Sequence, residues 1–405
     1  MSRERKRPAR AGERRARPHL RVLGTEITLI EPLRRMAEED LGVTLSFEVL
    51  DFLSAQRKAA LEPDSYDIYD HCFHNLDIVW FWRAIQPIEL GRIERWGEVS
   101  DLTKHGKISP LASPGRGENP NNVLYVQPDL SLSERPSSRI SMLPTVHNLD
   151  AFAYLPELFP DRSPEEASWA WLFDPEVRGR LVLVDEPGIG VFDAALAFEA
   201  RGDIRFADIG NMTIAEIDAL MALLWARRKE GDFASLWRTA AQSAAGMMSG
   251  RAGIGSMWSP GIATVRQGGR LLAEAVPKEG HRAWHSGLCL SARLTGDLLD
   301  TAYRYLNWWL DGRPGALLAR QGFYMSVTGR VQATMDAAEW DYWYAGRPAA
   351  RDLPAVDGRP LIARDAVRPG GSYWHRAAHI AVWNTTMDEY NYLARRWSQF
   401  AESFR

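Results

Sequence analysis

Three apolar runs alternate with two amphipathic segments in the first 75 residues, and this alternation constrains the fold more than any other feature of the sequence. The runs at 20–23, 43–49 and 66–69 are expected to be strands, and the segments at 28–41 and 55–61 are expected to be helices. Strand, helix, strand, helix, strand is the order that builds a parallel sheet with helices on its faces. The sequence therefore predicts an α/β fold.

Parallel sheets of this kind bind ligands at the carboxyl ends of their strands. In this sequence the three strand ends fall at 24–26, at Asp51 and at 70–75. We expect polar side chains from these three segments to line one crevice.

The length of 405 residues is a second constraint. A single core stops growing at roughly 250–300 residues, so we expect two lobes. Residues 141–154 form an apolar run that is broken by His147, Asn148 and Asp150. This pattern is typical of a buried strand whose backbone also lines a wet crevice. We interpret it as the strand that leads from one lobe into the other.

The rest of the chain continues to alternate between strands and helices. Strands are expected at 181–184, 252–257, 271–275 and 288–291, and helices at 191–201, 214–228, 262–267, 297–310, 315–321 and 375–403. Residues 109–139 are rich in Pro, Gly, Ser and Asn, and we expect a loop or lid insertion with a short edge strand at 123–126.

The net charge of −3 is distributed unevenly. Residues 1–18 carry eight basic and two acidic residues, a net +6, which leaves −9 for the rest. The body has no basic stripe with interleaved aromatic residues, so no nucleic-acid partner is expected. No apolar stretch approaches the ~20 residues of a membrane helix, and none follows the basic head. Two explanations for the missing apolar segment are considered: a leader peptide was removed or the start of the chain was mis-assigned, or the protein is cytoplasmic.

Enzyme motifs are absent from the sequence in a complete form. The segment Gly188-Ile189-Gly190 lacks the third glycine and the acidic residue of a dinucleotide fingerprint, and neither Gly-x-Ser-x-Gly nor a P-loop occurs. We therefore expect no enzymatic activity and no cofactor. Cys72 and Cys289 are too far apart in sequence to form a zinc-binding motif. They could be two free thiols or could form one disulfide bond.

Histidine is the commonest metal ligand, and four histidines follow or interrupt the expected strands. They are His71, His74, His147 and His285. No clustered carboxylates accompany them, so we predict no metal site. A metal-binding protein that uses His71, His74 or His285 is kept as an alternative.

Several motifs follow one another in an order that resembles a known family. They are residues 20–26, Tyr66-Asp67-Ile68 with Asp77, residues 143–154, Ser168-Trp169-Ala170 with Arg178-Gly179-Arg180-Leu181, residues 253–269 and Pro277-Lys278-Glu279-Gly280. This order is similar to that of the extracellular solute-binding proteins of ABC importers, and most similar to the spermidine/putrescine-binding kind.

The resemblance implies a two-lobed periplasmic-binding-protein fold of type II, in which crossover strands join the lobes. Lobe one would comprise 19–148 and 258–332, and lobe two 149–257 and 333–405, behind a basic disordered tail at 1–18. A monomeric periplasmic protein of this kind captures a small polar solute between its lobes. Closure of the hinge over the solute then presents a surface of the protein to the permease subunits of the importer. A cytoplasmic ligand sensor or enzyme that reuses the fold is the alternative.

Carried over position by position, the resemblance also places a set of residues near the cleft. They are Thr25, Glu26, Asp51, Cys72, His74, Asn75, Asp150, Glu186, Trp258, Trp284, Ser286 and Tyr324. Polyamine binders need carboxylates for ammonium groups and aromatic walls for methylenes. Trp258, Trp284 and Tyr324 fit the wall, and Glu186 fits the carboxylate.

The sequence departs from the family at several of these positions. The family has a second acidic residue shortly after the position of Glu186, where this sequence has Pro187-Gly188-Ile189-Gly190. An acidic residue is also common after the position of Trp284, where this sequence has His285 and Ser286. A pocket with fewer acids is a poorer match for a dication such as putrescine. It suits a monocation, a zwitterion or another polar solute.

Each of these residues also has a structural interpretation. Trp258 and Trp284 would then belong to the hinge core. Asp150 would cap a helix, and Glu186 before Pro187 would begin a turn.

Overall fold

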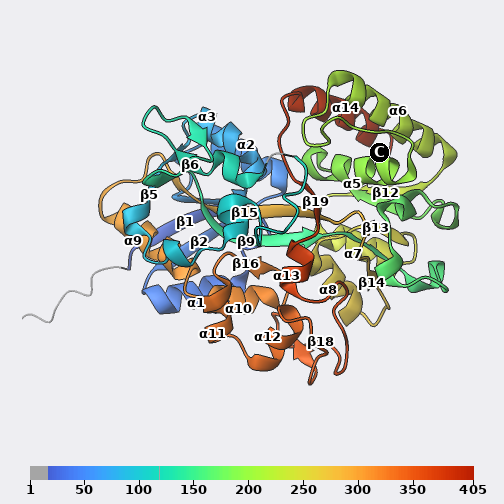
Figure 1. Ribbon diagram of the computed structural model, residues 1–405. Helices are drawn as coiled ribbons and strands as arrows, with labels where there is room; N and C mark the ends of the chain where they lie inside the picture. The colour runs from blue at the N-terminus through green and yellow to red at the C-terminus, as the bar shows by residue number, and fades with distance from the viewer. Residues whose placement is uncertain (1–16, 118) are drawn as a thin grey trace, which may run out of the picture.

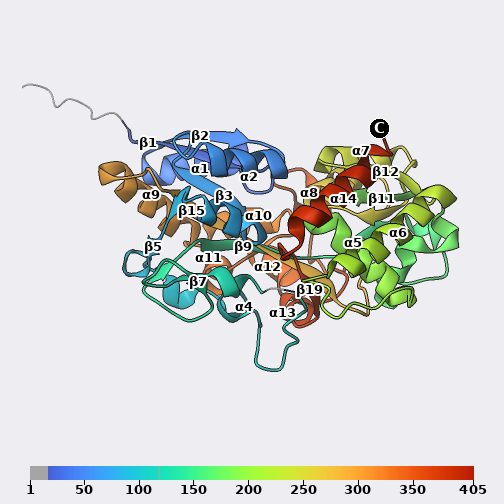
Figure 2. The same ribbon diagram turned by 90° about the horizontal axis from the view of Figure 1, so that it is seen from above.

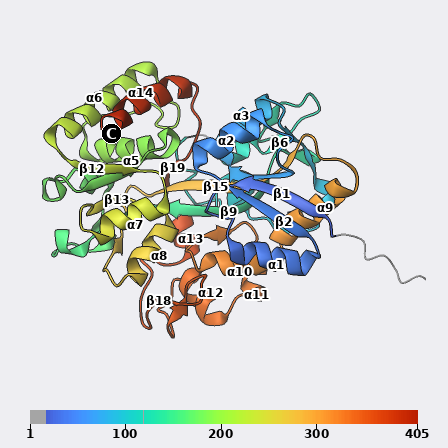
Figure 3. The same ribbon diagram turned by 180° about the vertical axis from the view of Figure 1, so that it is seen from behind.

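Two β-sheets, each covered by helices, lie side by side and form two lobes (Figure 1). The computed structural model describes residues 17–117 and 119–405, except for the side chains of Asn75 and Pro120. The predicted tail at 1–18 lies almost entirely outside the described residues. The first lobe is at the left in Figure 1 and the second at the right, and Figure 3 shows both from behind.

The first lobe begins as predicted, with three parallel strands and two helices. The strands are β1 (His19–Gly24), β2 (Thr44–Val49) and β3 (Ile68–Cys72), and the helices are α1 (Glu31–Leu41) and α2 (Phe52–Leu61). Helix α1 ends where Gly42 adopts a φ of 65°, a left-handed conformation that glycine reaches without strain. The first sheet has the order β16-β9-β15-β3-β1-β2.

Two long antiparallel strands form the centre of this sheet. They are β9 (Leu143–Asp150) and β15 (His281–Ser291), and every residue in both is buried. After β9 the chain passes through Ala151 into β10 (Phe152–Tyr154), which belongs to the second sheet. The prediction that residues 141–154 lead from one lobe into the other is therefore confirmed.

The second sheet has the order β12-β11-β13-β10-β14. Its other strands are β11 (Leu181–Val184), β12 (Phe233–Trp237), β13 (Ile254–Ser256) and β14 (Ala273–Glu274). Its helices are α5 (Pro187–Arg201), α6 (Ile214–Glu230), α7 (Ala240–Met248) and α8 (Ser259–Gln267). The motif that begins at Ser168 forms the 3-10 helix η7 (Trp169–Phe173).

The single helix predicted at 375–403 is wrong. The segment forms α13 (Tyr373–Ala377), strand β19 (Ile380–Trp383) and α14 (Tyr390–Glu402). Strand β19 extends the first sheet by pairing in parallel with β15, because its apolar residues fit a fully buried strand. Helix α14 packs on α5 and α6 of the second lobe (Figure 2). The chain therefore crosses between the lobes once more near its end.

The sheets and cores divide the chain differently from the predicted lobe boundaries at 258 and 333. Helix α8 packs on α7, and β14 pairs with β10, so residues 259–274 lie with the second lobe. Buried aromatic residues of the segment 340–373, such as Trp343 and Tyr373, belong to the first core. The reason is that residues far apart in sequence complete each sheet, which local patterns do not reveal.

Of the remaining elements, β4 (Ile85–Gln86) and β16 (Tyr324–Met325) are strands of the first sheet, and the others lie around it. The others are α3 (Leu76–Phe81), α4 (Asp101–His105), α9 (Gly296–Trp309), α10 (Arg313–Ala319), α11 (Thr328–Thr334), α12 (Ala337–Trp343), β17 (Leu353–Pro354) and β18 (Pro360–Ile362). In the described part of the chain, no helix combines the length and apolar character needed to cross a membrane.

The segment 109–139 contributes to a small separate sheet. This sheet contains β5 (Ile88–Glu89), β6 (Tyr125–Val126), β7 (Leu132–Ser133) and β8 (Arg139–Ile140), so the short strand expected at 123–126 is present. Arg116 from the same segment lies 2.6 Å from Glu199 of α5 and pairs with Val382 in a β-bridge. The insertion therefore contacts both lobes.

Candidate ligand-binding site

Three cavities follow one another along the interface between the lobes. We name them the outer cavity, of about 210 Å³, the middle cavity, of about 10 Å³, and the arginine pocket, of about 40 Å³. The outer and middle cavities share Ile27, Phe52 and Trp258, and the middle cavity and the arginine pocket share Asp150 and Ser259. The cavities thus form a continuous row.

The middle cavity brings together four residues that the sequence placed near a cleft. Cys72, Asp150, Trp258 and Trp284 line it, although they come from four separate segments. The Trp258 ring packs edge-on against Trp237, with 4.8 Å between ring centroids. Phe52 and Phe323 add further apolar wall, and the Phe323 ring lies 5.8 Å from that of Trp284. This cavity is therefore walled by aromatic rings.

Asp150 is the polar centre of the middle cavity. Its Oδ2 accepts a hydrogen bond of 2.7 Å from Trp284 Nε1, and its Oδ1 accepts one of 2.9 Å from Asn148 Nδ2. Burial raises the pKa of Asp150 to about 6, although Arg282 and the Trp284 N–H both favour the ionised form. Asp150 therefore titrates close to neutral pH and lies where two cavities meet.

Arg282 is a site residue that the sequence analysis missed. It lies two residues before Trp284 on β15, so both side chains project from the same face of the sheet. Its Nε donates to Asp193 of the second lobe at 2.7 Å, and its Nη1 donates to Asn384 at 3.1 Å. The sequence signal that would have identified it is an arginine two positions before Trp284, a residue that was itself placed near the cleft.

More carboxyl groups are buried near the middle cavity than Arg282 pairs with, although Asp70, Glu186 and Asp193 line none of the three cavities. Burial raises the pKa of Asp70 to about 7, of Glu186 to about 7, and of Asp193 above its ordinary value. Arg282 contacts Asp193 and lies 3.7 Å from Asp150. Within the described chain neither Asp70 nor Glu186 forms an ion pair, and nearby hydroxyl and amide groups only partly offset their burial. The site therefore has an excess of acid.

The outer cavity contains the three predicted residues at the ends of β1 and β2. Thr25, Glu26 and Asp51 line it together with Arg238 from the opposite lobe. Glu26 accepts a hydrogen bond of 3.0 Å from the backbone N–H of Ala240, the first residue of α7. This contact joins the lobes at a helix N-terminus, where the helix dipole favours an anion.

Asp51 also has a structural task, because it caps α2. Its side chain accepts hydrogen bonds from the backbone N–H and the hydroxyl of Ser54, at 3.0 and 2.6 Å. Burial raises the pKa of Asp51, but these bonds and the charge of Arg238 together bring it below the ordinary value. Asp51 is therefore ionised at neutral pH and only partly free to contact a ligand.

The other predicted residues lie around the cavities. Glu186 is the N-cap residue of α5 and lies close to His74, whose pKa burial lowers to about 3. Ser286 pairs with Cys72 across the sheet. Asn75 belongs to the 3-10 helix η1 (Phe73–Asn75), and its side chain lies outside the described structure.

Tyr324 does not line any of the three cavities. Its ring packs against Tyr373 and Tyr344, with centroid distances of 4.5 and 5.3 Å. Neighbouring residues of an extended segment point to opposite faces, so Phe323 occupies the cavity wall in its place. Both cysteines are unpaired and buried, which excludes the single bridge. Among the described residues, no group of three or more His, Cys, Asp or Glu side chains could hold a metal ion.

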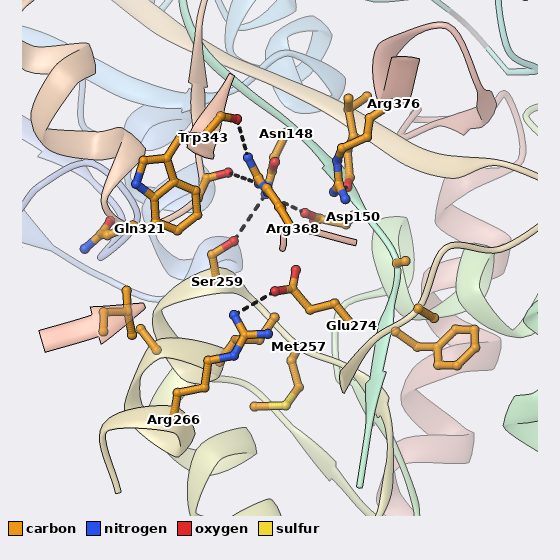
Figure 4. A pocket seen from close by; sticks show the side chains of 18 residues that line it. Asn148, Asp150, Met257, Ser259, Arg266, Glu274, Gln321, Trp343, Arg368 and Arg376 are labelled. Carbon is orange, nitrogen blue, oxygen red and sulfur yellow. Dashed lines mark hydrogen bonds and ion pairs between the residues drawn. The ribbon is translucent and has the colours of Figure 1, made fainter. Parts of the chain in front are cut away.

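The arginine pocket closes the row at its inner end (Figure 4). Arg266 of α8 forms an ion pair of 2.9 Å with Glu274, and Arg368 and Arg376 approach from the first lobe. Asn148 and Asp150 of β9 line the same pocket. The sequence analysis did not predict it, because its arginines come from segments that carry no family motif.

Solved structures of solute-binding proteins have the same fold. The spermidine/putrescine ABC transporter substrate-binding protein PotD of Streptococcus pneumoniae is 12% identical over 96% of this chain and 100% of its own, with a TM-score of 0.59. The TpPotD lipoprotein of Treponema pallidum is 9% identical over 96% of this chain and 99% of its own, with a TM-score of 0.64. The protein AgtB of A. tumefaciens R10, solved with agropinic acid, is 12% identical over 95% of this chain and 99% of its own, with a TM-score of 0.60.

No protein-family model and no curated protein matches the sequence. At these identities the structural likeness establishes the fold alone. The two-lobed periplasmic-binding-protein fold implied by the sequence motifs is thereby confirmed.

Proposed function

We propose that this protein is the substrate-binding component of an ABC importer and captures a small amine-bearing solute between its lobes. The observation that carries the proposal is the excess of buried carboxyl groups beside the aromatic middle cavity. The proposal includes a periplasmic location, a monomeric state and membrane permease subunits as partners. It agrees with the transport proteins among the structures of the same fold.

The charge balance favours a cationic ligand. Asp70, Asp150, Glu186 and Asp193 are all buried, and Arg282 is the guanidinium that ion-pairs with Asp193 and lies near Asp150. An uncompensated buried charge costs several kcal/mol, so a cation would favour the ionised form of Asp70 and Glu186, which form no ion pair within the described chain. The ammonium group of a solute would supply that cation.

The aromatic wall favours an amine on an apolar chain. Trp258, Trp284, Phe52 and Phe323 surround the middle cavity, which lies next to Asp150. Aromatic faces attract ammonium groups and also cover methylene groups. A metal cation gains little from such a wall, whereas an alkyl ammonium uses both features.

Capture requires the lobes to separate. The middle cavity holds only about 10 Å³, roughly the space that a single water molecule needs, and is too small for a solute. Contacts such as Glu26 to Ala240 and Arg282 to Asp193 hold the closed arrangement. We infer that the solute enters an open state and that its contacts with both lobes stabilise the closed one.

Thermal unfolding against a panel of amines tests the proposal. The probes are n-alkylamines, diamines, amino acids and betaines, and a ligand at 100 times its Kd adds about 2.7 kcal/mol to the stability. The shift given by an amine should disappear in Asp150→Asn and persist in Asp357→Asn, which alters an exposed turn. The absence of a shift with every amine-bearing probe would overturn the proposal.

A further inference from the structure

The arginine pocket is a second charged environment in the interlobe row, with the opposite sign to the acidic cleft. Its three arginines come from different parts of the chain: Arg266 from α8, Arg368 from the segment before α13, and Arg376 from α13. Figure 4 shows them around one small space. A pocket built in this way from both lobes changes shape when the lobes move.

Two of these arginines are buried and have no acidic ion-pair partner among the described residues. Arg368 is 4% exposed and donates to the carbonyls of Trp343 and Gly322 at 2.8 and 3.0 Å. Arg376 is 5% exposed and donates to the carbonyls of Pro369 and Leu149 at 2.8 and 3.0 Å.

Backbone carbonyls satisfy N–H groups, but they do not neutralise a guanidinium, which keeps its charge in proteins. Within the described chain neither Arg368 nor Arg376 forms an ion pair, and Arg376 Nε has no hydrogen-bond partner. The pocket therefore contains buried positive charge and an unused donor.

The pKa of Glu274, a titratable group in the same pocket, reflects this positive charge. Burial raises the pKa of Glu274, yet Arg266, Arg368 and Arg376 bring it below its ordinary value. Glu274 is already paired with Arg266 at 2.9 Å. Two carboxyl groups, those of Glu274 and Asp150, therefore face three guanidinium groups, and the pocket lacks at least one anion.

Asp150 links the two environments. It lines the middle cavity together with the aromatic wall, and it also lines the arginine pocket. Ser259, the first residue of α8, is the other residue shared by both cavities. A ligand that extends past Asp150 and Ser259 would have its two ends in fields of opposite sign.

We propose that the arginine pocket binds the carboxylate of the solute, whose ammonium group lies beside Asp150. The ligand is then an amino acid in the broad sense, a zwitterion with a short chain between amine and carboxylate. This inference rests on the proposed function and narrows its ligand class. Arginine suits the task because its planar fork pairs with both oxygens of a carboxylate. The pocket volume of about 40 Å³ matches one small polar group and not a whole solute.

Binding measurements on the unaltered protein test the inference without any risk to folding. The probes are α- and ω-amino acids of three to six carbons, the carboxamide of each, and the n-alkylamine of the same length, compared by titration calorimetry. We expect at least one amino acid to bind ten times or more tightly than its carboxamide and its amine. Equal binding of the amine or the carboxamide would overturn the inference and leave the proposed function standing. No binding by any probe would overturn both.

The variant Arg376→Gln tests the same contact from the protein side. It should weaken binding of the best amino acid at least tenfold and change binding of the matched amine less than twofold. Arg359→Gln is the control, because Arg359 is an exposed arginine that pairs with Asp357. Asp150→Asn should instead weaken the amine and the amino acid together. A loss of equal size for amine and amino acid in Arg376→Gln would contradict the assignment.

Discussion

Arg282 Nε lies 2.7 Å from Asp193 Oδ1, and this fully buried ion pair joins a strand of the first lobe to a helix of the second. Arg282 belongs to β15 and Asp193 to α5. The pair lies immediately beside Asp150, so it connects the hinge strands to the acidic cleft. It therefore couples the closed arrangement of the lobes to the charge of the ligand site.

Replacement of Arg282 by Met should destabilise the protein strongly. The change leaves Asp193 and Asp150 buried without their cation, and breaking a buried pair in this way costs about 3–5 kcal/mol. The free energy of unfolding, measured by urea denaturation at pH 7.5, checks the prediction. The double variant Arg282→Met with Asp193→Asn should recover part of the loss. A loss of less than ~1 kcal/mol for the single variant, the range of exposed pairs, would show that the pair contributes little.

Replacement of Trp258 by Ala should weaken binding of an amine probe at least tenfold, about 1.4 kcal/mol. Trp258 lines both the outer and the middle cavity, so its loss removes wall from each. Calorimetric titration with the best amine of the panel gives the ratio. Trp374→Ala is the matched control, since Trp374 is partly exposed and lines none of the three cavities. Unchanged affinity in Trp258→Ala would remove this residue from the site.

The sequence predicted the fold well where local patterns suffice. The alternation in the first 75 residues led to β1, β2 and β3, and the broken apolar run at 141–154 led to the lobe connection. Strand β15 was predicted only over 288–291, because Arg282 and His285 interrupt the apolar pattern inside a fully buried strand. Strand β19 was missed because its four apolar residues lie next to helical segments and pair with parts of the chain that are far away in sequence.

The site was predicted in part for the same reason. Cys72, Asp150, Trp258 and Trp284 meet in one cavity, since strand ends and motif positions indicate a crevice. The arginine pocket depends on residues between 321 and 376 that return to the crossover strand from far along the chain. Local sequence periodicity does not show which distant segments come together, so the tertiary structure was needed to find the arginine pocket.

Affinity for an amine should rise as the pH increases from 5.5 to 7.5. Burial places the pKa of Asp150 at about 6 and that of Glu186 at about 7, both above the values of an unfolded chain. The folded, ligand-free protein therefore binds more protons than the unfolded chain. These two groups favour folding most at low pH, and that stability is lost as the pH rises through about 6 to 7. A cationic ligand prefers the ionised carboxylates, so its binding follows the opposite trend.

Calorimetry of one amine at several pH values measures this dependence. We expect the affinity to increase several-fold across the interval and to level off above pH 8. Glu186→Gln should flatten the upper part of the curve, because the group with the higher pKa is removed. An affinity independent of pH in the unaltered protein would mean that neither carboxyl group ionises on binding.

Cys72 offers a direct measure of lobe opening. The thiol lines the middle cavity at the interface, and burial raises its pKa, so it should react slowly with a thiol reagent in the closed state. The variant Cys289→Ser isolates this reaction, because Cys289 is fully buried in the first core and lines none of the three cavities. A saturating amine should slow the reaction of Cys72 at least tenfold, since the ligand stabilises the closed lobes. Equal rates with and without ligand would show that the thiol becomes accessible by a motion other than hinge opening.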